Sequence, residues 1–359
     1  MGATRIPRRS LLRTAGGVTA AAAVAGCGSG TSRGASGGKS SKSLVVSNSG
    51  GTYGDALRKA VYDPFSKETG ISITTVNYQS AQILAQIKQG DPQFDVIDNS
   101  LLVYPKMARA GALHPLDHDR LKHAGPVPDH LRTEYAIGKN TWASLMAYRK
   151  DSLARTPRNW ADFWNTSKFS GPRSLQSLDA DVPELEFALL ADGVALDELY
   201  PLDVDRAFKA MTRIRGDVKK FWDTGAMPAL LIGRKEVALT SLWNGRADDL
   251  IKQGQPVAYQ WAGARRHTNG WAIPKGSEKL DTTYRLIDYS LRPEVQAALA
   301  KIFPQGPVVP AALKRLSTGD LERLPTSAAH LKTGFDLDVD WWDKNQDAVA
   351  KRWQEWANV

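Results

Sequence analysis

Apolar and polar positions alternate along this chain with two periods, one typical of buried strands and the other of amphipathic helices. The segments after residue 43 read, in order, as strand, helix, strand, helix and strand: 44–47, 55–69, 71–76, 81–89 and 94–98. Further along they read as helix, turn, strand and helix: 207–214, 230–233, 237–242 and 247–253. This alternation predicts an α/β fold with a mostly parallel sheet, whose ligands bind beyond the carboxyl ends of the strands.

The first 26 residues have a different pattern, with a basic start, a short apolar run and no acidic residue. Arg8 and Arg9 precede an apolar run at 14–26, which is shorter than the roughly 18–20 residues that span a bilayer. This pattern is typical of a secretory signal. It resembles a twin-arginine signal ending in a bacterial lipobox at Cys27. In that interpretation residues 1–26 are removed, Cys27 is lipidated, and residues 27–43 form a flexible Gly/Ser-rich tether.

Cysteine content and charge narrow the possible functions. Cys27 is the single cysteine, so the rest of the chain has no disulfide and no thiolate chemistry. Its alternative interpretation is a chance cysteine in an ordinary export signal. The formal charge of +9 includes four arginines in the signal and three basic residues in the tether, which leaves +2 for residues 44–359. A body this close to neutral is not expected to bind nucleic acid.

Catalytic and metal-binding motifs are absent from the sequence. It contains no nucleophile elbow, zinc-protease motif, phosphate-binding loop or dinucleotide fingerprint in its required context. The best metal candidate, His114, His118 and His123, lies in a polar loop and is interpreted as solvated. We therefore expect a protein that is not an enzyme and that needs no cofactor or metal.

The chain has eleven tryptophans, and their settings differ. Trp160 and Trp164, four residues apart, and those at 341–356 suit helix packing. Trp243 and Trp271 instead stand beside polar residues at strand ends. Aromatic faces next to fixed polar groups are typical of a small-molecule cleft, although a cavity-filling role in the core is the alternative.

Several sequence blocks together resemble the extracellular solute-binding proteins of ABC importers, in particular the spermidine/putrescine-binding group. The blocks are 49–53, 63–65, 68–70, 94–96, 159–164, 200–203, 242–246, 272–274, 291–295 and 324–326. Together they extend over residues 44–359. A membrane-tethered lipoprotein is the form that such receptors take in Gram-positive bacteria, which agrees with the predicted lipobox.

The resemblance implies a two-lobed, type II periplasmic-binding-protein-like fold that closes over one ligand about hinge strands. We expect hinge strands near 143–148 and 269–273. Lobe one would then comprise 44–146 and about 270–315, and lobe two 147–269. The lobe to which the helices of 316–359 belong is left open.

The resemblance also implies a ligand site. Polyamine receptors box a methylene chain between aromatic rings and hold its ammonium ends with carboxylates. Trp243 and the carboxylates Asp181 and Glu184 keep this pattern. Arg246, however, stands where putrescine-binding members carry an aspartate, and Asn269 and His267 replace an aspartate and a tryptophan.

The arginine favours a carboxylate or phosphonate on the ligand, since a guanidinium binds such groups bidentately. The leading hypothesis is a small amine-containing solute, an amino acid or GABA-like zwitterion, with Arg246 at its acid end. An ion pair of Arg246 with Asp248, Asp249 or an acid of lobe one is the alternative role. The predicted ligand-binding residues are Gly51, Thr52, Tyr53, Ser100, Asp181, Glu184, Trp243, Arg246, His267, Asn269 and Trp271, with the turn at 50–52 adding N–H donors.

Other functions remain open at this point. True polyamine binding is the main alternative, followed by a ferric-type binding protein and a secreted hydrolase. The expected partners are a membrane permease and its ATPase. The expected location is the extracellular face of the cytoplasmic membrane (the periplasmic side in a Gram-negative cell), where a monomer is held by its lipid anchor.

Overall fold

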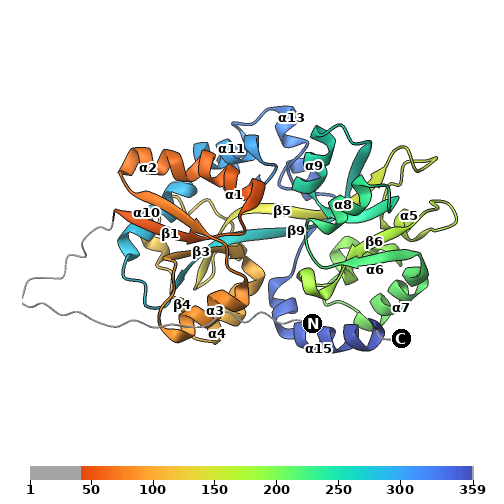
Figure 1. Ribbon diagram of the computed structural model, residues 1–359, viewed down its shortest axis with the longest axis horizontal. Coiled ribbons are helices and arrows are strands. Elements are labelled where there is room, and N and C mark those ends of the chain that lie inside the picture. The colour runs from red at the N-terminus through yellow and green to blue at the C-terminus, as the bar shows by residue number, and fades with distance from the viewer. Residues whose placement is uncertain (1–41, 358–359) are drawn as a thin grey trace, which may run out of the picture. The chain divides into compact units, whose positions relative to one another are not determined.

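The computed structural model describes residues 42–357, which form a single mixed sheet flanked by helices (Figure 1). The main path of the sheet has the order β2-β1-β3-β9-β5-β8-β6-β7, with three two-residue strands, β4, β10 and β11, off this path. The strands are β1 Ser43–Ser47, β2 Ser72–Val76, β3 Val96–Ser100, β4 Leu113–His114, β5 Ala136–Arg149, β6 Arg173–Gln176, β7 Val218–Trp222, β8 Leu239–Trp243, β9 Val257–Pro274, β10 Gly306–Pro307 and β11 Phe335–Asp336. The predicted signal, Cys27 and nearly all of the tether lie outside the described residues.

β5 and β9 are the two long strands, and they connect the two halves of the sheet. They pair antiparallel from Ala136 opposite Ala272 to Arg149 opposite Val257, with two register shifts. On one side β9 pairs with β3, and on the other β5 pairs with β8. The expected two-lobed α/β fold with hinge strands is confirmed, and both predicted hinge segments lie within these strands.

Lobe one is defined here by the hydrophobic clusters on the β1–β2–β3 side of the sheet. Leu44 and Val46 of β1 are fully buried there against helices that include α1, α2, α10 and α11. β1 pairs parallel with both β2 and β3, as the strand–helix rhythm predicts. The helices on this side are α1 Gly51–Leu57, α2 Asp63–Thr69, α3 Ser80–Gln89, α4 Tyr104–Arg109, α10 Leu280–Ser290, α11 Pro293–Ile302 and α12 Pro310–Leu313. α1 and α2 are joined by a single π-helical turn, so the helix predicted at 55–69 exists but begins four residues earlier.

Lobe two is defined by the clusters on the β6–β7–β8 side. Trp160 packs flat on Phe187 with ring centroids 3.8 Å apart. The helices on this side are α5 Trp160–Trp164, α6 Leu185–Ala191, α7 Val204–Ile214, α8 Met227–Gly233 and α9 Asn244–Lys252. The predicted turn at 230–233 is wrong, because these residues end α8. Pro228 occupies the first turn of that helix, where a missing N–H costs nothing.

The C-terminal segment runs through α13 Thr318–Leu321 and α14 Ala328–Leu331 to the long helix α15 Val339–Ala357. Trp342, Val349, Trp353 and Trp356 of α15 are buried in the core of lobe two. The packing role expected for the C-terminal tryptophans is confirmed.

Among the described residues, no helix combines the length and apolarity that crossing a bilayer requires.

Candidate ligand-binding site

The strand ends that would bind a ligand meet where the two lobes face each other. β1 and β3 end there from lobe one, and β8 ends there at Trp243, directly before α9. Between them pass the middle segments of β5 and β9, where Asn140 lies opposite Asn269 and Trp142 opposite His267. This junction corresponds to the ligand position expected for open α/β sheets.

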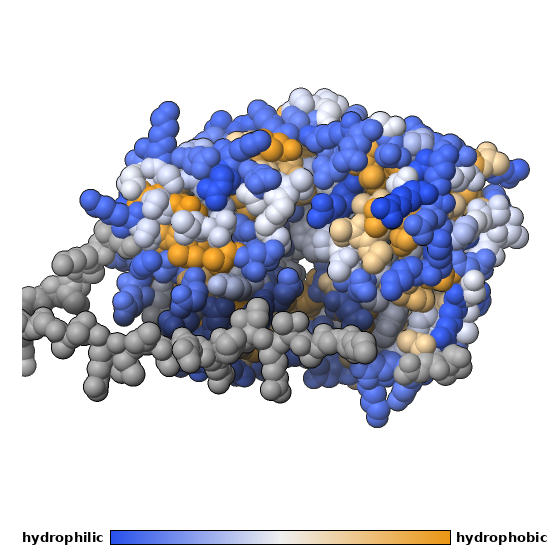
Figure 2. Space-filling view, in the orientation of Figure 1, coloured by the Kyte–Doolittle hydropathy of each residue, from blue (hydrophilic) through white to orange (hydrophobic). Residues whose placement is uncertain are grey.

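A cavity of about 570 Å³ lies between the lobes, and Figure 2 shows the surface hollowed there. From lobe one it is lined by the segments 100–108 and 130–136, and from lobe two by Tyr200 and residues 336–340. Two of the predicted ligand residues, Ser100 and His267, are in its wall. Its size is in the range of small-molecule sites.

Aromatic rings adjoin the cavity at His267. The Trp142 ring stacks on His267, with centroids 4.0 Å apart and planes within 3°. It also lies 5.0 Å from Trp243, and Trp243 is 6.0 Å from Trp222. Trp142 was missed by the sequence analysis, although its place one residue before the predicted hinge strand at 143–148 was an available signal. The half-buried rings of Trp142 and Trp243 thus provide the aromatic wall that the sequence had placed at Trp243 and Trp271.

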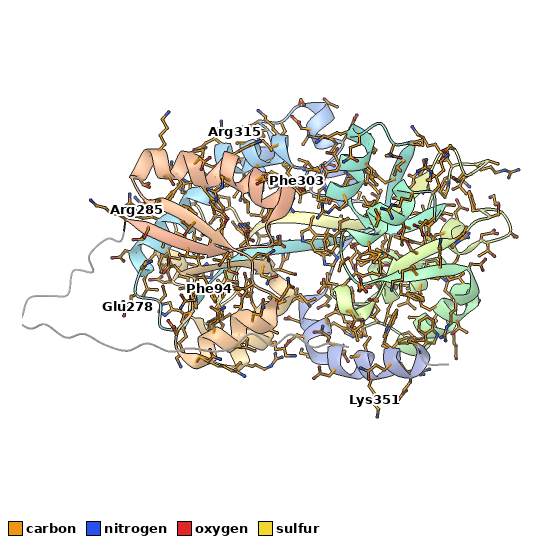
Figure 3. The ribbon with its side chains drawn as sticks, in the orientation of Figure 1. Phe94, Glu278, Arg285, Phe303, Arg315 and Lys351 are labelled. Carbon is orange, nitrogen blue, oxygen red and sulfur yellow. The ribbon has the colours of Figure 1, made fainter. Side chains whose placement is uncertain are left out.

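Phe303, at the end of α11, extends this wall toward lobe one (Figure 3). Its ring centroid is 6.0 Å from that of Tyr53. A Cβ placed on Gly245 would lie 2.7 Å from the Phe303 ring, so the first turn of α9 can approach this ring only because residue 245 is glycine.

The Trp243 ring depends on a second glycine. A Cβ on Gly225 would come within 2.1 Å of the ring, which no ordinary adjustment accommodates. We therefore expect Gly225→Ala to displace Trp243 and to weaken ligand binding by roughly tenfold, the usual scale of one lost aromatic contact. Titration calorimetry measures this, and Gly216→Ala, whose Cβ would meet nothing within 4 Å, is the control. Unchanged affinity in a folded Gly225→Ala variant would remove Trp243 from the site.

Buried carboxylates outnumber the guanidinium beside them on the lobe-two side of the site. Arg265 is fully buried and its Nη1 lies 2.7 Å from Glu186. Glu184 and Asp181 lie close enough to Arg265 to raise the pKa of its guanidinium. Burial raises the pKa of Asp181 to about 6 and that of Glu184 to about 7, against a smaller opposing effect of Arg265. Three acids facing one arginine leave the cluster favourable for a cation.

His267 has a defined tautomer in this cluster. Arg265 Nε donates to His267 Nε2 at 3.1 Å, so Nε2 must be the unprotonated nitrogen. Burial, with Arg265 next, holds the pKa of His267 well below its ordinary value, so the ring is neutral. Its Nδ1–H therefore faces Asp181, whose Oδ2 is 3.7 Å away. At this distance Nδ1–H forms no hydrogen bond, so the ring is a neutral wall with a donor that has no partner among the described residues.

On the lobe-one side, the Tyr53 hydroxyl forms hydrogen bonds with both hinge strands, at Asn140 of β5 and Asn269 of β9. This hydroxyl lies 3.2 Å from Asp98 and 3.3 Å from Asn140 Oδ1, and Asn269 Nδ2 donates to it at 3.4 Å. Asp98 in turn forms a buried ion pair with Lys139 at 2.6 Å. Neither Asp98 nor Lys139 was identified from sequence, because isolated charges in strands gave no signal.

Arg246 lies half-buried in the first turn of α9, three residues after Trp243. Among the described residues, no carboxylate comes within 4.0 Å of its guanidinium, and Asp248 is instead paired with Lys252 and Arg323. Of the expected alternatives, an ion pair with Asp248 is not formed, whereas Asp249 interacts with Arg246 electrostatically, since the guanidinium opposes the rise that burial causes in the pKa of Asp249. A cation in the first turn of a helix is also electrostatically unfavourable, which suits a group retained for a ligand anion.

The remaining predicted residues are Trp271, Ser100, Gly51 and Thr52, and of these only Trp271 has a position that differs from the expected one. Trp271 is fully buried in the core of lobe one, where its Nε1 donates to Ser290, so it does not form the aromatic wall. The position of Trp271 near a predicted strand end suggested exposure, but β9 continues to Pro274. In the pairing of β3 with β9, Trp271 lies opposite Asp98, and its side chain packs among residues of α10 and α11. Ser100 accepts from Leu102 N as a turn cap. Gly51 and Thr52 are exposed at the start of the short helix α1.

Comparison with known proteins agrees with this geometry. The family model described as "Bacterial extracellular solute-binding protein" matches residues 60–329. A gamma-aminobutyric acid-binding protein of Pseudomonas aeruginosa is 29% identical over 88% of this chain and 91% of its own. The spermidine/putrescine-binding periplasmic protein of Escherichia coli is 26% identical over 67% of this chain and 71% of its own.

A solved ABC transporter substrate-binding protein of Bradyrhizobium japonicum superposes with a TM-score of 0.83 at 30% identity, over 88% of this chain and 99% of that one. Because these relatives bind and deliver solutes, the expectation that this protein is not an enzyme is confirmed. The chain belongs to the bacterial extracellular solute-binding protein family, whose members serve ABC importers.

Proposed function

We propose that this protein captures a GABA-like zwitterion, a small amino acid with separated amine and carboxylate, between its lobes and delivers it to an ABC permease. The proposal is supported by two observations. Arg246, three residues after Trp243 in the first turn of α9, has no carboxylate within 4.0 Å among the described residues. Asp181 and Glu184 lie near Arg265, which is hydrogen-bonded to the His267 ring that stacks on Trp142. A ligand with one cationic and one anionic end matches this arrangement of charges.

The amine end is assigned to Asp181 and Glu184. Glu184 accepts from the backbone N–H of Gln176 through Oε2, at 2.8 Å, while its buried Oε1 has no hydrogen bond within 3.5 Å among the described residues, although the Ser241 hydroxyl is near enough to lower the pKa of Glu184. A ligand ammonium supplies the missing donor and ionises a carboxylate that burial otherwise keeps partly protonated. Charge-assisted hydrogen bonds of this kind are among the stronger polar contacts.

The methylene chain is assigned to the rings of Trp142 and Trp243. Their faces bury apolar ligand surface, and an ammonium near either ring gains a cation–π attraction. The carboxylate end is assigned to Arg246, whose planar fork matches two carboxylate oxygens.

Polyamine binding remains the second candidate, favoured by the acid-rich cluster around Arg265 and by the Escherichia coli relative. A diamine would place its second ammonium near Arg246, where like charges repel. The zwitterion therefore fits better.

A thermal-shift and calorimetry screen tests whether the ligand is a zwitterion or a polyamine. The protein, with Cys27→Ser to prevent acylation, is mixed with gamma-aminobutyric acid, other ω-amino acids, α-amino acids, putrescine and spermidine. A ligand at 100 times its Kd stabilises the folded state by about 2.7 kcal/mol. Stabilisation by ω-amino acids supports the proposal, whereas stabilisation by diamines alone contradicts it.

Binding would be coupled to closure about β5 and β9, with contacts from both lobes favouring the closed form. In this proposal the lobes divide near residues 146 and 269. A permease and its ATPase, as in the family, would receive the closed protein.

We also propose that the protein is a monomer exported by its twin-arginine segment and held at the extracellular face of the membrane by lipid on Cys27. Two acyl chains would anchor it stably. Labelling cells with a radioactive fatty acid tests this, since label should be incorporated by the natural protein and not by the Cys27→Ser variant. Equal labelling of both would contradict the lipid anchor.

A further inference from the structure

We propose that the buried pair Asp98–Lys139 positions the ligand-facing aromatic wall by fixing the direction of a hydrogen-bond chain from lobe one to Trp142. The pair itself does not touch the ligand. The inference rests on the proposed function for its effect on affinity, but the orientation of Trp142 is independent of any ligand.

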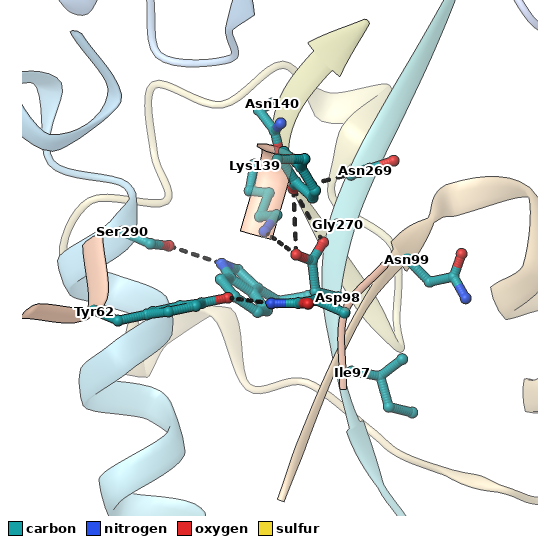
Figure 4. A network of polar contacts seen from close by, with 12 residues as sticks. Tyr62, Ile97, Asp98, Asn99, Lys139, Asn140, Asn269, Gly270 and Ser290 are labelled. Atoms are coloured by element: carbon teal, nitrogen blue, oxygen red, sulfur yellow. Dashed lines mark hydrogen bonds and ion pairs between the residues drawn. The ribbon is translucent and has the colours of Figure 1, made fainter. Parts of the chain in front are cut away.

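The chain begins at a carboxylate that can only accept. Lys139 Nζ lies 2.6 Å from Asp98 Oδ2, and both side chains are almost completely buried. The ammonium also lies 3.9 Å from the centroid of the Trp271 ring. Gln296 Nε2 donates to the Lys139 carbonyl at 2.8 Å, which holds the backbone of this residue in place. Asp98, the Trp271 ring and Gln296 thus fix the position of Lys139, and Figure 4 shows its ion pair with Asp98.

The ionised carboxylate dictates the direction of the next bonds. Two acceptors lie within reach of the single hydroxyl hydrogen of Tyr53, Asp98 Oδ2 at 3.2 Å and Asn140 Oδ1 at 3.3 Å, and the ionised carboxylate is the stronger of the two. The Tyr53 oxygen is then left as an acceptor, and Asn269 Nδ2 donates to it at 3.4 Å. This fixes the Asn269 amide with its Oδ1 on the other side.

The last bond reaches the aromatic wall. Trp142 Nε1 donates to Asn269 Oδ1 at 3.0 Å. An inverted Asn269 amide would face this indole N–H with another donor and would break the bond. The ring held in this way is the one that stacks on His267 and contacts Trp243. Trp271, which the sequence predicted to contact the ligand, instead supports the start of the chain.

The bonds connect segments that closure must keep in register. Tyr53 belongs to α1, Asp98 to β3, Lys139 to β5 and Asn269 to β9. The pair therefore orients a ring on the hinge strands from the core of lobe one. A merely structural pair would stabilise the lobe without determining which way the Asn269 amide points.

The test uses the double variant Asp98→Leu/Lys139→Met. Proteins often remain folded when both partners of a buried ion pair are replaced by apolar side chains, whereas replacing only one partner leaves an unpaired buried charge. The ligand-free protein is labelled with ¹⁵N, and the indole N–H of Trp142 is assigned with Trp142→Phe. We expect this proton to exchange with solvent about tenfold faster in the double variant, the scale of one lost hydrogen bond. The indole of Trp356, which donates to Thr212, is the internal reference.

Tyr53→Phe is the second variant, since it removes only the hydroxyl and should give the same faster exchange if the double variant fails to fold. The triple variant should show the same exchange rate as Tyr53→Phe alone, because all three substitutions interrupt the same series of hydrogen bonds. Arg149→Met/Asp151→Asn, at an ion pair between the buried Arg149 that ends β5 and the exposed Asp151, is the control and should leave the Trp142 signal unchanged. An unchanged Trp142 signal in folded Tyr53→Phe or in the folded double variant overturns the proposal.

Affinity supplies a separate readout. For the ω-amino acid that binds the natural protein, Kd should rise by about tenfold in both Tyr53→Phe and the double variant, consistent with one lost hydrogen bond. If no ω-amino acid binds the natural protein, the proposed function fails, while the exchange measurement still decides the role of the pair. Faster exchange with unchanged Kd would contradict the role in ligand binding.

Discussion

Arg246→Ala is expected to weaken binding of gamma-aminobutyric acid by roughly 100-fold, because a hydrogen-bonded carboxylate–guanidinium contact contributes about 1.5–3 kcal/mol. The loss should be selective. Ligands without a carboxylate, such as putrescine, should bind no worse and gain from removal of a like charge. Titration calorimetry with both ligand classes measures the difference.

A matched control separates the local contact from general electrostatics. Arg285→Ala removes the same charge from the exposed face of α10, and Figure 3 shows Arg285 far from the junction of the lobes. It should leave both affinities within about twofold, since exposed charges at that range are screened. Equal loss for acidic and non-acidic ligands in Arg246→Ala would mean that the residue supports the fold of α9 instead of binding a carboxylate.

Arg246→Asp extends the same test. It introduces the carboxylate that putrescine-binding relatives are expected to carry here. Affinity should shift from the ω-amino acid toward diamines, which would identify residue 246 as the position that determines ligand charge.

Binding should also weaken by up to about 1000-fold as the pH falls from 8 to 5, with up to about 100-fold from Glu184 and about tenfold from Asp181. Burial raises the pKa of Glu184 to about 7 and that of Asp181 to about 6. An ammonium ligand needs these groups ionised, so binding releases protons, and each coupled group costs up to tenfold in affinity per pH unit below its pKa. Calorimetry in buffers of different ionisation enthalpy gives both the affinity and the number of protons released.

The folding stability of the ligand-free protein should change in the opposite direction and increase as the pH falls. A carboxyl group whose pKa is higher in the folded than in the unfolded state binds more protons when folded, so its contribution to stability grows as the pH falls through the folded pKa toward about 4. These two groups therefore favour the unliganded fold between pH 7 and 5 while they disfavour ligand binding. Denaturant unfolding with and without ligand distinguishes the two effects.

Glu184→Gln and Asp181→Asn should each flatten part of this dependence, Glu184→Gln near pH 7 and Asp181→Asn near pH 6, at the cost of weaker binding at pH 8. Asp281→Asn is the control, because that carboxylate is exposed at the start of α10, where it pairs with Arg120. A profile that persists unchanged in the Glu184→Gln/Asp181→Asn double variant would place the amine elsewhere.

The sequence predicted the elements where a period and a boundary signal coincided. Residues 207–214 have a helical pattern preceded by Asp203, and the structure shows α7 with the Asp203 carboxylate accepting from Arg206 N at 3.0 Å. At 230–233 the apolar run was too short to show a period, so the end of α8 was read as a turn. Element type thus followed from local pattern only where the pattern was long enough.

What the sequence by itself determined is the α/β class, the two lobes with their hinge segments and the receptor family, because each depends on local pattern or on ordered blocks. The tertiary structure decided which side chains meet. Trp142 and His267 are 125 positions apart along the chain, and Lys139 and Asp98 are 41 apart, yet strand pairing brings each pair into contact. It also buried Trp271 and left Trp243 half-exposed, although both stand at strand ends beside polar residues. Strand order and register determine such contacts, and neither is written in any short stretch of sequence.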